Sequence, residues 1–165
     1  VPPAASSPQL APREDWRELA RRGLLRKAFT AAEASGFDAA CATSSAAELL
    51  QLGDAARLSG RPERARQALL SLRTRHPSDP RRAAAAFALG KVAFDQSGAF
   101  AQAAEWFATS LREQPNGSLS REAAGRLIEA YQRAGNATAA QTAARSYLAR
   151  YPDGPHADVA RSSLR

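Results

Sequence analysis

The sequence contains very few of the residues that build catalytic centres or metal sites. Cys41 is the only cysteine, which excludes a disulfide framework and any zinc site that needs several thiolates. His76 and His156 are the only histidines, and each lies beside a proline in a turn. No catalytic triad, carboxylate cluster or glycine-rich phosphate loop is visible. We therefore predict a chain that is not an enzyme and that binds no metal, cofactor or small-molecule substrate.

Residues that favour β-strands are also scarce. Val, Ile and Thr are infrequent, whereas Ala and Arg, which favour helices, dominate the chain. The 165 residues are 44% hydrophobic and 24% charged, as expected of one folded domain. No apolar run reaches the length of about 18 residues that a membrane-spanning helix needs. The composition predicts an all-α fold, and the absence of an initiator Met before Val1 indicates a fragment or a processed form.

Three segments of the chain repeat one another without gaps. Each begins with a glycine and reaches a proline 17 residues later; the glycines are Gly60, Gly98 and Gly135, and the prolines are Pro77, Pro115 and Pro152. Gly23 marks a fainter, earlier unit. Apolar residues recur at helical spacing on both sides of each glycine. We expect the glycine to end a first helix in the left-handed conformation and the proline to end a second helix.

The boundaries of the units are marked by capping residues. Ser45 and Glu48 form a predicted capping box, and Asp79 before Pro80 is typical of a helix start. The predicted organisation is a Pro/Ala/Ser linker over 1–12 and a single domain over 13–165. Within that domain we expect a divergent N-terminal hairpin over 13–44, repeats over 46–79, 83–117 and 121–154, and a capping helix over 155–165.

The repeat pattern resembles that of the tetratricopeptide repeat family. The first unit carries the family's apolar, glycine, alanine and proline positions as Leu49, Leu52, Gly53, Ala56, Ala65, Leu69, Leu72 and Pro77. The resemblance implies an α-solenoid, a right-handed superhelix of antiparallel helix hairpins. Ile128 stands where the family has a glycine, so we expect slightly wider helix packing in the third unit.

The segment RYPDGPHADVARSSL near the end of the chain is similar to envelope-associated repeat proteins. These are the Tol-Pal-associated periplasmic repeat proteins and the C-terminal regions of FecR-like anti-sigma regulators. This resemblance implies a periplasmic or cell-envelope domain that is tethered to a membrane-anchored part and acts in signalling.

Stacked hairpins of this kind present a concave groove lined by their first helices, which suits a protein or peptide partner. The register predicts the groove residues Leu50, Asp54, Arg57, Phe87, Lys91, Phe94, Arg126, Glu129 and Arg133. Apolar anchors beside cations favour an acidic, hydrophobic peptide or a C-terminal carboxylate. For Phe87 and Phe94, a place in the core between helices is an equal alternative. The asparagines of the family's carboxylate clamp are missing, so we do not predict a chaperone-tail receptor.

A formal charge of +7 leaves two other functions open. An arginine-rich surface could bind nucleic acid or anionic lipid; its residues are Arg57, Arg61, Arg64, Arg66, Arg73, Arg75, Arg81 and Arg82. The aromatic platforms of single-strand binders are missing, which disfavours nucleic acid. Self-association through the apolar ends of the repeat array is the other alternative. Trp106 is expected to pack against the following hairpin and Trp16 to cover the N-terminal edge.

Overall fold

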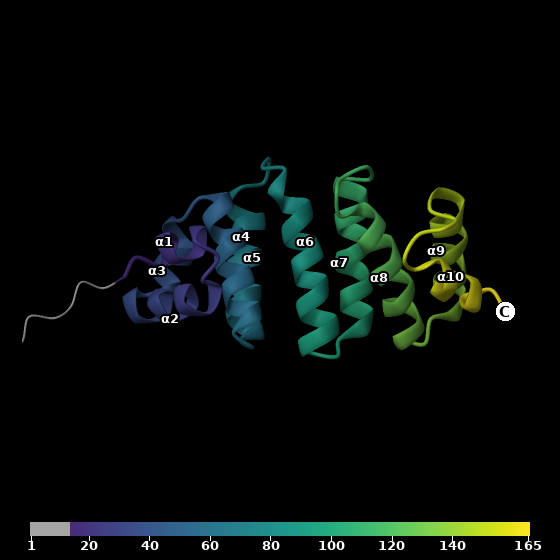
Figure 1. Ribbon diagram of the computed structural model, residues 1–165, viewed down its shortest axis with the longest axis horizontal. Helices are drawn as coiled ribbons and strands as arrows, with labels where there is room; N and C mark the ends of the chain where they lie inside the picture. Colours follow the sequence, from purple (N-terminus) through teal and green to yellow (C-terminus); the bar gives the residue numbers. More distant parts are fainter. Residues whose placement is uncertain (1–13) are drawn as a thin grey trace, which may run out of the picture.

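The computed structural model describes residues 14–165, so the predicted linker lies outside the described residues. The described part is all-helical, and its helices follow one another along the long axis of the molecule, from α1–α3 at one end to α9 and α10 at the other (Figure 1). The elements are α1 (Trp16–Arg21), α2 (Leu25–Ser35), α3 (Phe37–Thr43), α4 (Ala46–Leu58), α5 (Pro62–Arg75), α6 (Arg81–Lys91), the π-helical turn η1 (Val92–Gln96), α7 (Phe100–Glu113), α8 (Ser120–Arg133), α9 (Ala137–Arg150) and α10 (Ala157–Ser163). None of these helices is long and apolar enough to cross a membrane.

The helices pair into three hairpins, α4 with α5, α6–η1 with α7, and α8 with α9. Gly60, Gly98 and Gly135 follow the first helix of each hairpin with φ values of 69°, 62° and 74°. Only glycine adopts this left-handed backbone without strain, so these residues turn the chain into the second helix, as predicted. The second helices α5, α7 and α9 each end two residues before the repeat's proline. The packing of α10 on α8 and α9 closes the array.

The predicted caps hold α4 and α6 at their N-termini. Ser45 Oγ accepts a hydrogen bond from the backbone N–H of Glu48, and the Glu48 carboxylate accepts one from the backbone N–H of Ser45. These two bonds lower the number of unpaired donors in the first turn of α4 and confirm the capping box. At α6, the Asp79 carboxylate accepts the N–H of Arg81 at 2.8 Å. The helix begins at Arg81, one residue later than Pro80 would suggest.

The N-terminal part differs from the single hairpin that the sequence predicts. Residues 14–44 form three short helices, because Gly36, with φ of 109°, interrupts the chain between α2 and α3. Trp16 is buried in the core cluster of this end. Cys41 is buried as well, and loss of hydration raises the pKa of its thiol to about 11. A thiol with so high a pKa is a packing residue and a poor nucleophile near neutral pH.

The second hairpin contains one residue more than the other two. Leu89 precedes Gly98 by nine residues, whereas Leu52 and Leu127 precede Gly60 and Gly135 by eight. The π-helical turn η1 absorbs this residue, because a π-turn accommodates one extra residue within a helix. The spacing of 38 residues between the first two glycines is therefore explained by a local bulge.

Each hairpin is packed by a pair of residues of complementary size. A Cβ atom on Gly53 would lie 2.6 Å from the Leu69 side chain, and one on Gly90 would lie 2.6 Å from Phe107. In the third hairpin the large residue is Ile128 on the first helix, and Ala144 stands at the position of Leu69 and Phe107. Both Ile128 and Ala144 are fully buried in one cluster. In this hairpin the large side chain therefore lies on the first helix and the small one on the second, which compensates for the missing glycine.

Candidate functional site

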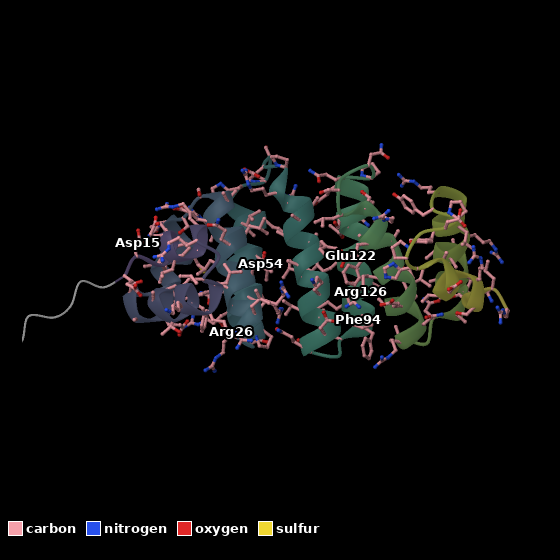
Figure 2. All side chains as sticks on the ribbon, in the orientation of Figure 1. Asp15, Arg26, Asp54, Phe94, Glu122 and Arg126 are labelled. Atoms are coloured by element: carbon pink, nitrogen blue, oxygen red, sulfur yellow. The ribbon has the colours of Figure 1, made fainter. Side chains whose placement is uncertain are left out.

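The residues predicted for the groove come from the first helices of the three hairpins. Asp54 and Arg57 lie on α4, Phe94 lies on η1, and Arg126 lies on α8 (Figure 2). Gln96, also on η1, donates to the backbone carbonyl of Arg57 at 2.7 Å and ties the first two hairpins together. These predicted residues thus lie on successive first helices of the array.

The centre of this surface is a partly exposed aromatic pair covered by arginines. The rings of Phe94 and Phe100 meet edge to face, with centroids 5.0 Å apart. The Arg126 guanidinium lies 4.3 Å from the Phe94 centroid, and the Arg133 guanidinium lies 4.5 Å from the Phe100 centroid. Such cation–π contacts hold the planar guanidinium groups over the rings. We call Phe94, Phe100, Arg126 and Arg133 the aromatic–arginine cluster. Phe100 was not predicted, because its position in the repeat is not a groove position.

Two of the four cations predicted for the groove are already neutralised within the chain. Arg126 contacts Asp95 at 2.5 Å and Glu129 at 3.1 Å. Arg57 contacts Asp54 at 3.0 Å. These pairs are partly exposed, so each contributes only modestly to stability, but each fixes a side chain in place.

The other two cations have no carboxylate partner in residues 14–165. Lys91 lies 5.7 Å from the Phe87 ring, and Arg133 lies on the Phe94 and Phe100 rings. Among the nine predicted groove residues, Lys91 and Arg133 are therefore the cations free to pair with an incoming carboxylate. Asp95, which the sequence analysis did not include, enters the site because the extra residue in η1 shifts its register.

One of the predicted groove residues belongs to the interior of the fold, and another is partly buried. Phe87 is only 6% exposed and packs on Phe107 with ring centroids 5.6 Å apart. Leu50 is partly buried against the core cluster of the first hairpins. Of the two alternatives left open for the aromatics, Phe87 is thus a core residue, whereas Phe94 remains partly exposed. Sequence spacing cannot separate the two, because both lie on the same helix within two turns.

Glu129 connects the groove surface to the C-terminal cap. Its second carboxylate oxygen lies 3.5 Å from Nε2 of His156, at the start of α10. The His156 ring sits where a Cβ on Gly125 would lie, 2.2 Å from the ring carbon, so only glycine at 125 admits it. No group of three or more potential metal ligands occurs among residues 14–165.

The arginine-rich surface considered above is largely neutralised by the chain itself. Six of its eight arginines form ion pairs with carboxylates: Arg57, Arg64, Arg66, Arg73, Arg81 and Arg82. A seventh, Arg75, donates to the backbone carbonyls of Cys41 and Ser44. The surface therefore carries far less free positive charge than the sequence suggests, which removes the main support for phosphate binding.

Stacked helix hairpins with a side-chain cluster on their first helices define a helical-repeat scaffold. Two family models, both described as tetratricopeptide repeat, match residues 50–118 and 126–154. The chain carries tetratricopeptide repeats, and such repeats generally act as non-enzymatic scaffolds for protein–protein interaction. The all-α solenoid fold is confirmed.

Solved structures support the same fold over nearly the whole chain. Crystal structures of kinesin light chain TPR-like repeats from Podosopora anserina match with TM-scores of 0.68 and 0.66 at 18% identity; they cover 90% of this chain and 81% and 82% of those chains. MamA matches with a TM-score of 0.64 at 17% identity, covering 92% of this chain and 91% of that one. At these identities the likeness shows the fold alone. No curated protein matches the sequence.

Proposed function

We propose that this chain binds an acidic, hydrophobic peptide segment of a partner protein across the first helices of its hairpins. The observation that carries the proposal is the partly exposed Phe94–Phe100 pair beside Arg133, with Lys91 three residues before Phe94 along the chain. Neither cation has a carboxylate partner among the described residues. An apolar side chain of the peptide would pack on the rings, and its carboxylates would pair with the two free cations.

The paired residues of the groove serve a different purpose. Arg57 with Asp54, and Arg126 with Asp95 and Glu129, present both signs of charge at fixed positions. Fixed pairs favour partners with complementary charge order and disfavour others, so they would set the orientation of the peptide and contribute less to affinity.

We further propose that the domain works at the bacterial cell envelope, next to a membrane-anchored part. The support is the resemblance of residues 150–164 to envelope-associated repeat proteins, together with the Pro/Ala/Ser-rich composition of residues 1–12. Signalling from a tethered sensor domain would need a partner-binding surface of the kind described here.

Selection from a peptide display library tests the groove directly. We expect enriched peptides to combine acidic residues with a large apolar residue. The triple variant Phe94→Ala/Lys91→Glu/Arg133→Glu should lose them by about tenfold or more, because an aromatic contact and two charge pairs are removed together. Arg121 and Arg145 are exposed on α8 and α9 outside the groove, so Arg121→Glu/Arg145→Glu is a matched charge control.

Two results would contradict the proposal. One is equal binding of the enriched peptides to the triple variant and to the wild type. The other is enrichment without any acidic bias. The proposed location is tested by cross-linking the domain to proteins of the cell-envelope fraction. We expect the selected sequences to occur in the proteins that cross-link. Cross-linking confined to cytosolic proteins would contradict that location.

A further inference from the structure

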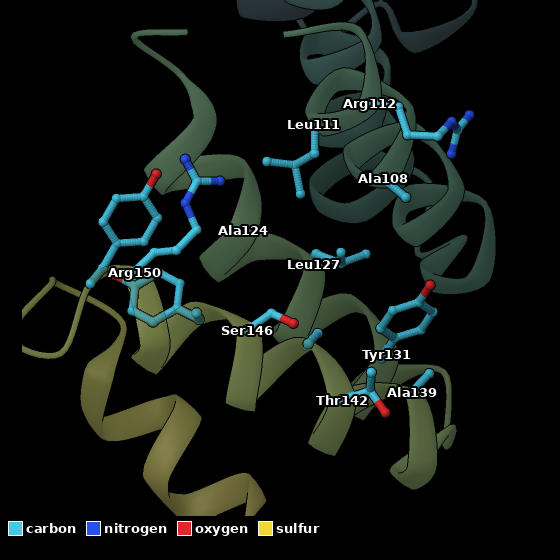
Figure 3. Close-up of a pocket in the computed structure, with 13 residues that line it drawn as sticks. Ala108, Leu111, Arg112, Ala124, Leu127, Tyr131, Ala139, Thr142, Ser146 and Arg150 are labelled. Atoms are coloured by element: carbon cyan, nitrogen blue, oxygen red, sulfur yellow. The ribbon is translucent and has the colours of Figure 1, made fainter. Parts of the chain in front are cut away.

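The space between α7 and α9 holds a cavity of about 490 Å³, with α8 as its floor. Figure 3 shows Leu111, Leu127 and Arg150 among the residues that line it. This volume falls within the usual range of ligand-binding pockets. The cavity is open to solvent, so a partner can reach it without any rearrangement of the helices.

The corresponding space between α5 and α7, which we call the closed junction, is filled by the chain itself. Trp106 reaches from α7 back onto the core cluster of the preceding hairpin, opposite to the direction predicted from the sequence. The Arg73 guanidinium lies 5.3 Å from its ring centroid. Arg73 also donates two hydrogen bonds to the Glu113 carboxylate, at 2.8 and 2.9 Å. An aromatic ring and a carboxylate thus complete this junction.

The space between α7 and α9, which we call the open junction, has the same backbone register but lacks both groups. Counted from the repeat glycine, Ala143 stands at the position of Trp106, and Arg150 stands at the position of Glu113. Leu111 stands at the position of Arg73. The cavity exists because an indole ring is replaced by a methyl group and the carboxylate by a guanidinium.

The residues that line the open junction are complementary to the two groups that it lacks, an indole ring and a carboxylate. Its wall and floor are mainly apolar, with Leu111, Leu127, Tyr131 and Tyr151 among the lining residues. Arg150, at the opening, donates to the carbonyl oxygen of Pro115 and to Asn116 but forms no ion pair within residues 14–165. A recessed, partly exposed apolar surface beside a cation without a carboxylate is complementary to an aromatic side chain next to an acidic one.

We propose that the open junction binds a helical segment of a partner protein that inserts a tryptophan and pairs a carboxylate with Arg150. The partner would supply the indole that Trp106 supplies in the closed junction and a carboxylate that faces Arg150, which itself stands at the position of Glu113. Groups three, four or seven positions apart lie on one face of a helix, so one partner helix can present both. This site lies on a different face of α8 from the groove, because Leu127 and Tyr131 project at about 100° to 160° from Arg126 and Arg133 at 100° per residue.

Fluorescein-labelled, alanine-based helical peptides with one tryptophan and a glutamate three, four or seven residues later test the proposal. We expect saturable binding by fluorescence anisotropy and amide shifts in NMR spectra confined to α7, α8 and α9. A peptide with alanine for the tryptophan should bind about tenfold more weakly, and one with glutamine for the glutamate about threefold more weakly.

Variants of the protein test whether the peptide binds in the cavity. Ala143→Trp should abolish peptide binding because the protein's own indole then occupies the space. Ala149→Trp places the same ring on an exposed position of α9 and should leave binding unchanged. Arg150→Gln should reproduce the threefold loss, whereas Arg145→Gln, also exposed on α9, should not.

Several outcomes would overturn the proposal. Unchanged binding to Ala143→Trp would place the peptide elsewhere, and shifts centred on Phe94 and Arg133 would place it in the groove. Binding of dodecanoate, seen as amide shifts confined to α7, α8 and α9, without any peptide binding would indicate a small amphiphile as the occupant. Sedimentation that shows a wild-type dimer and an Ala143→Trp monomer would indicate a second copy of the chain. Apart from shifts at Phe94 and Arg133, these results do not bear on the groove, which the variants of the preceding section test independently.

Discussion

The two junctions between second helices share one backbone arrangement, but side chains fill one of them and leave the other open. In the closed junction, Trp106 and the Arg73–Glu113 pair fill the space and join α5 to α7. In the open junction, Ala143 leaves a cavity between α7 and α9. Because each repeat contacts only its neighbours, its stability is roughly a sum of its own and its interface contributions. A filled junction therefore adds stability to the array, and an open one leaves surface for a partner.

The largest expected effect comes from emptying the closed junction. Trp106→Ala should destabilise the domain by about 3 kcal/mol, because it removes a large, mostly packed ring and leaves a cavity. Leu111→Ala, which enlarges a cavity already present in the open junction, should cost less than half as much. Urea unfolding followed by circular dichroism measures both. Equal costs would mean that the two junctions do not differ in packing as described.

The packing inside the third hairpin can be tested by exchanging the sizes of the two side chains at positions 128 and 144. Ala144→Leu should destabilise the third hairpin by about 2 kcal/mol, because Ile128 already occupies the space that glycine leaves free in the other hairpins. The double variant Ile128→Ala/Ala144→Leu restores the total volume. It should be more stable than the sum of the single changes by about 1 kcal/mol. Additive effects would show that the two side chains do not share one space.

The open junction should become more stable when it is filled. Ala143→Trp should increase the free energy of unfolding by about 1 kcal/mol, as cavity-filling substitutions commonly do. Ala149→Trp, on the exposed side of the same helix, should change it by less than about 0.5 kcal/mol. Thermal unfolding of the three proteins at one concentration gives the comparison. A lower melting temperature for Ala143→Trp would show that the cavity does not have the shape of the missing indole.

Much of the fold could be predicted because its signals are local. Gly60, Gly98 and Gly135 mark helix ends by their backbone freedom, and Ser45 marks a helix start by its cap. Each signal acts within a few residues, so the sequence carries it without knowledge of the tertiary structure. The three helices over residues 14–44 could not be predicted in this way, because that region keeps the repeat glycine Gly23 but lacks the repeat's proline, and Gly36 adds a helix break that the other units do not have.

The candidate site was predicted less well because it depends on packing between helices. Phe87 and Phe94 have similar sequence surroundings, and only the tertiary contact with Phe107 makes Phe87 a core residue. Asp95 reaches Arg126 because η1 contains an extra residue, and that consequence cannot be read from composition. The cavity of the open junction requires a comparison of Trp106 with Ala143 in three dimensions.

The smallest expected effect concerns the ion pair of the closed junction. It is measured as a change in how the free energy of unfolding depends on pH. Hydrogen bonds from Arg73 hold the pKa of Glu113 below its usual range, and the charges of Arg73 and Arg82 act in the same direction. A carboxyl group with a lowered pKa in the folded state stabilises the protein above the pKa of its unfolded state. That contribution is lost as the pH falls through the lower, folded-state pKa.

Glu113→Gln should therefore cost less than about 1 kcal/mol at neutral pH and flatten the loss of stability below roughly pH 5. Glu105→Gln, on the exposed side of α7 and without an ion pair among residues 14–165, should leave the acid slope unchanged. Urea unfolding at a series of pH values separates the two variants. An unchanged slope in Glu113→Gln would mean that Trp106 alone, without the ion pair, accounts for the greater stability of the closed junction.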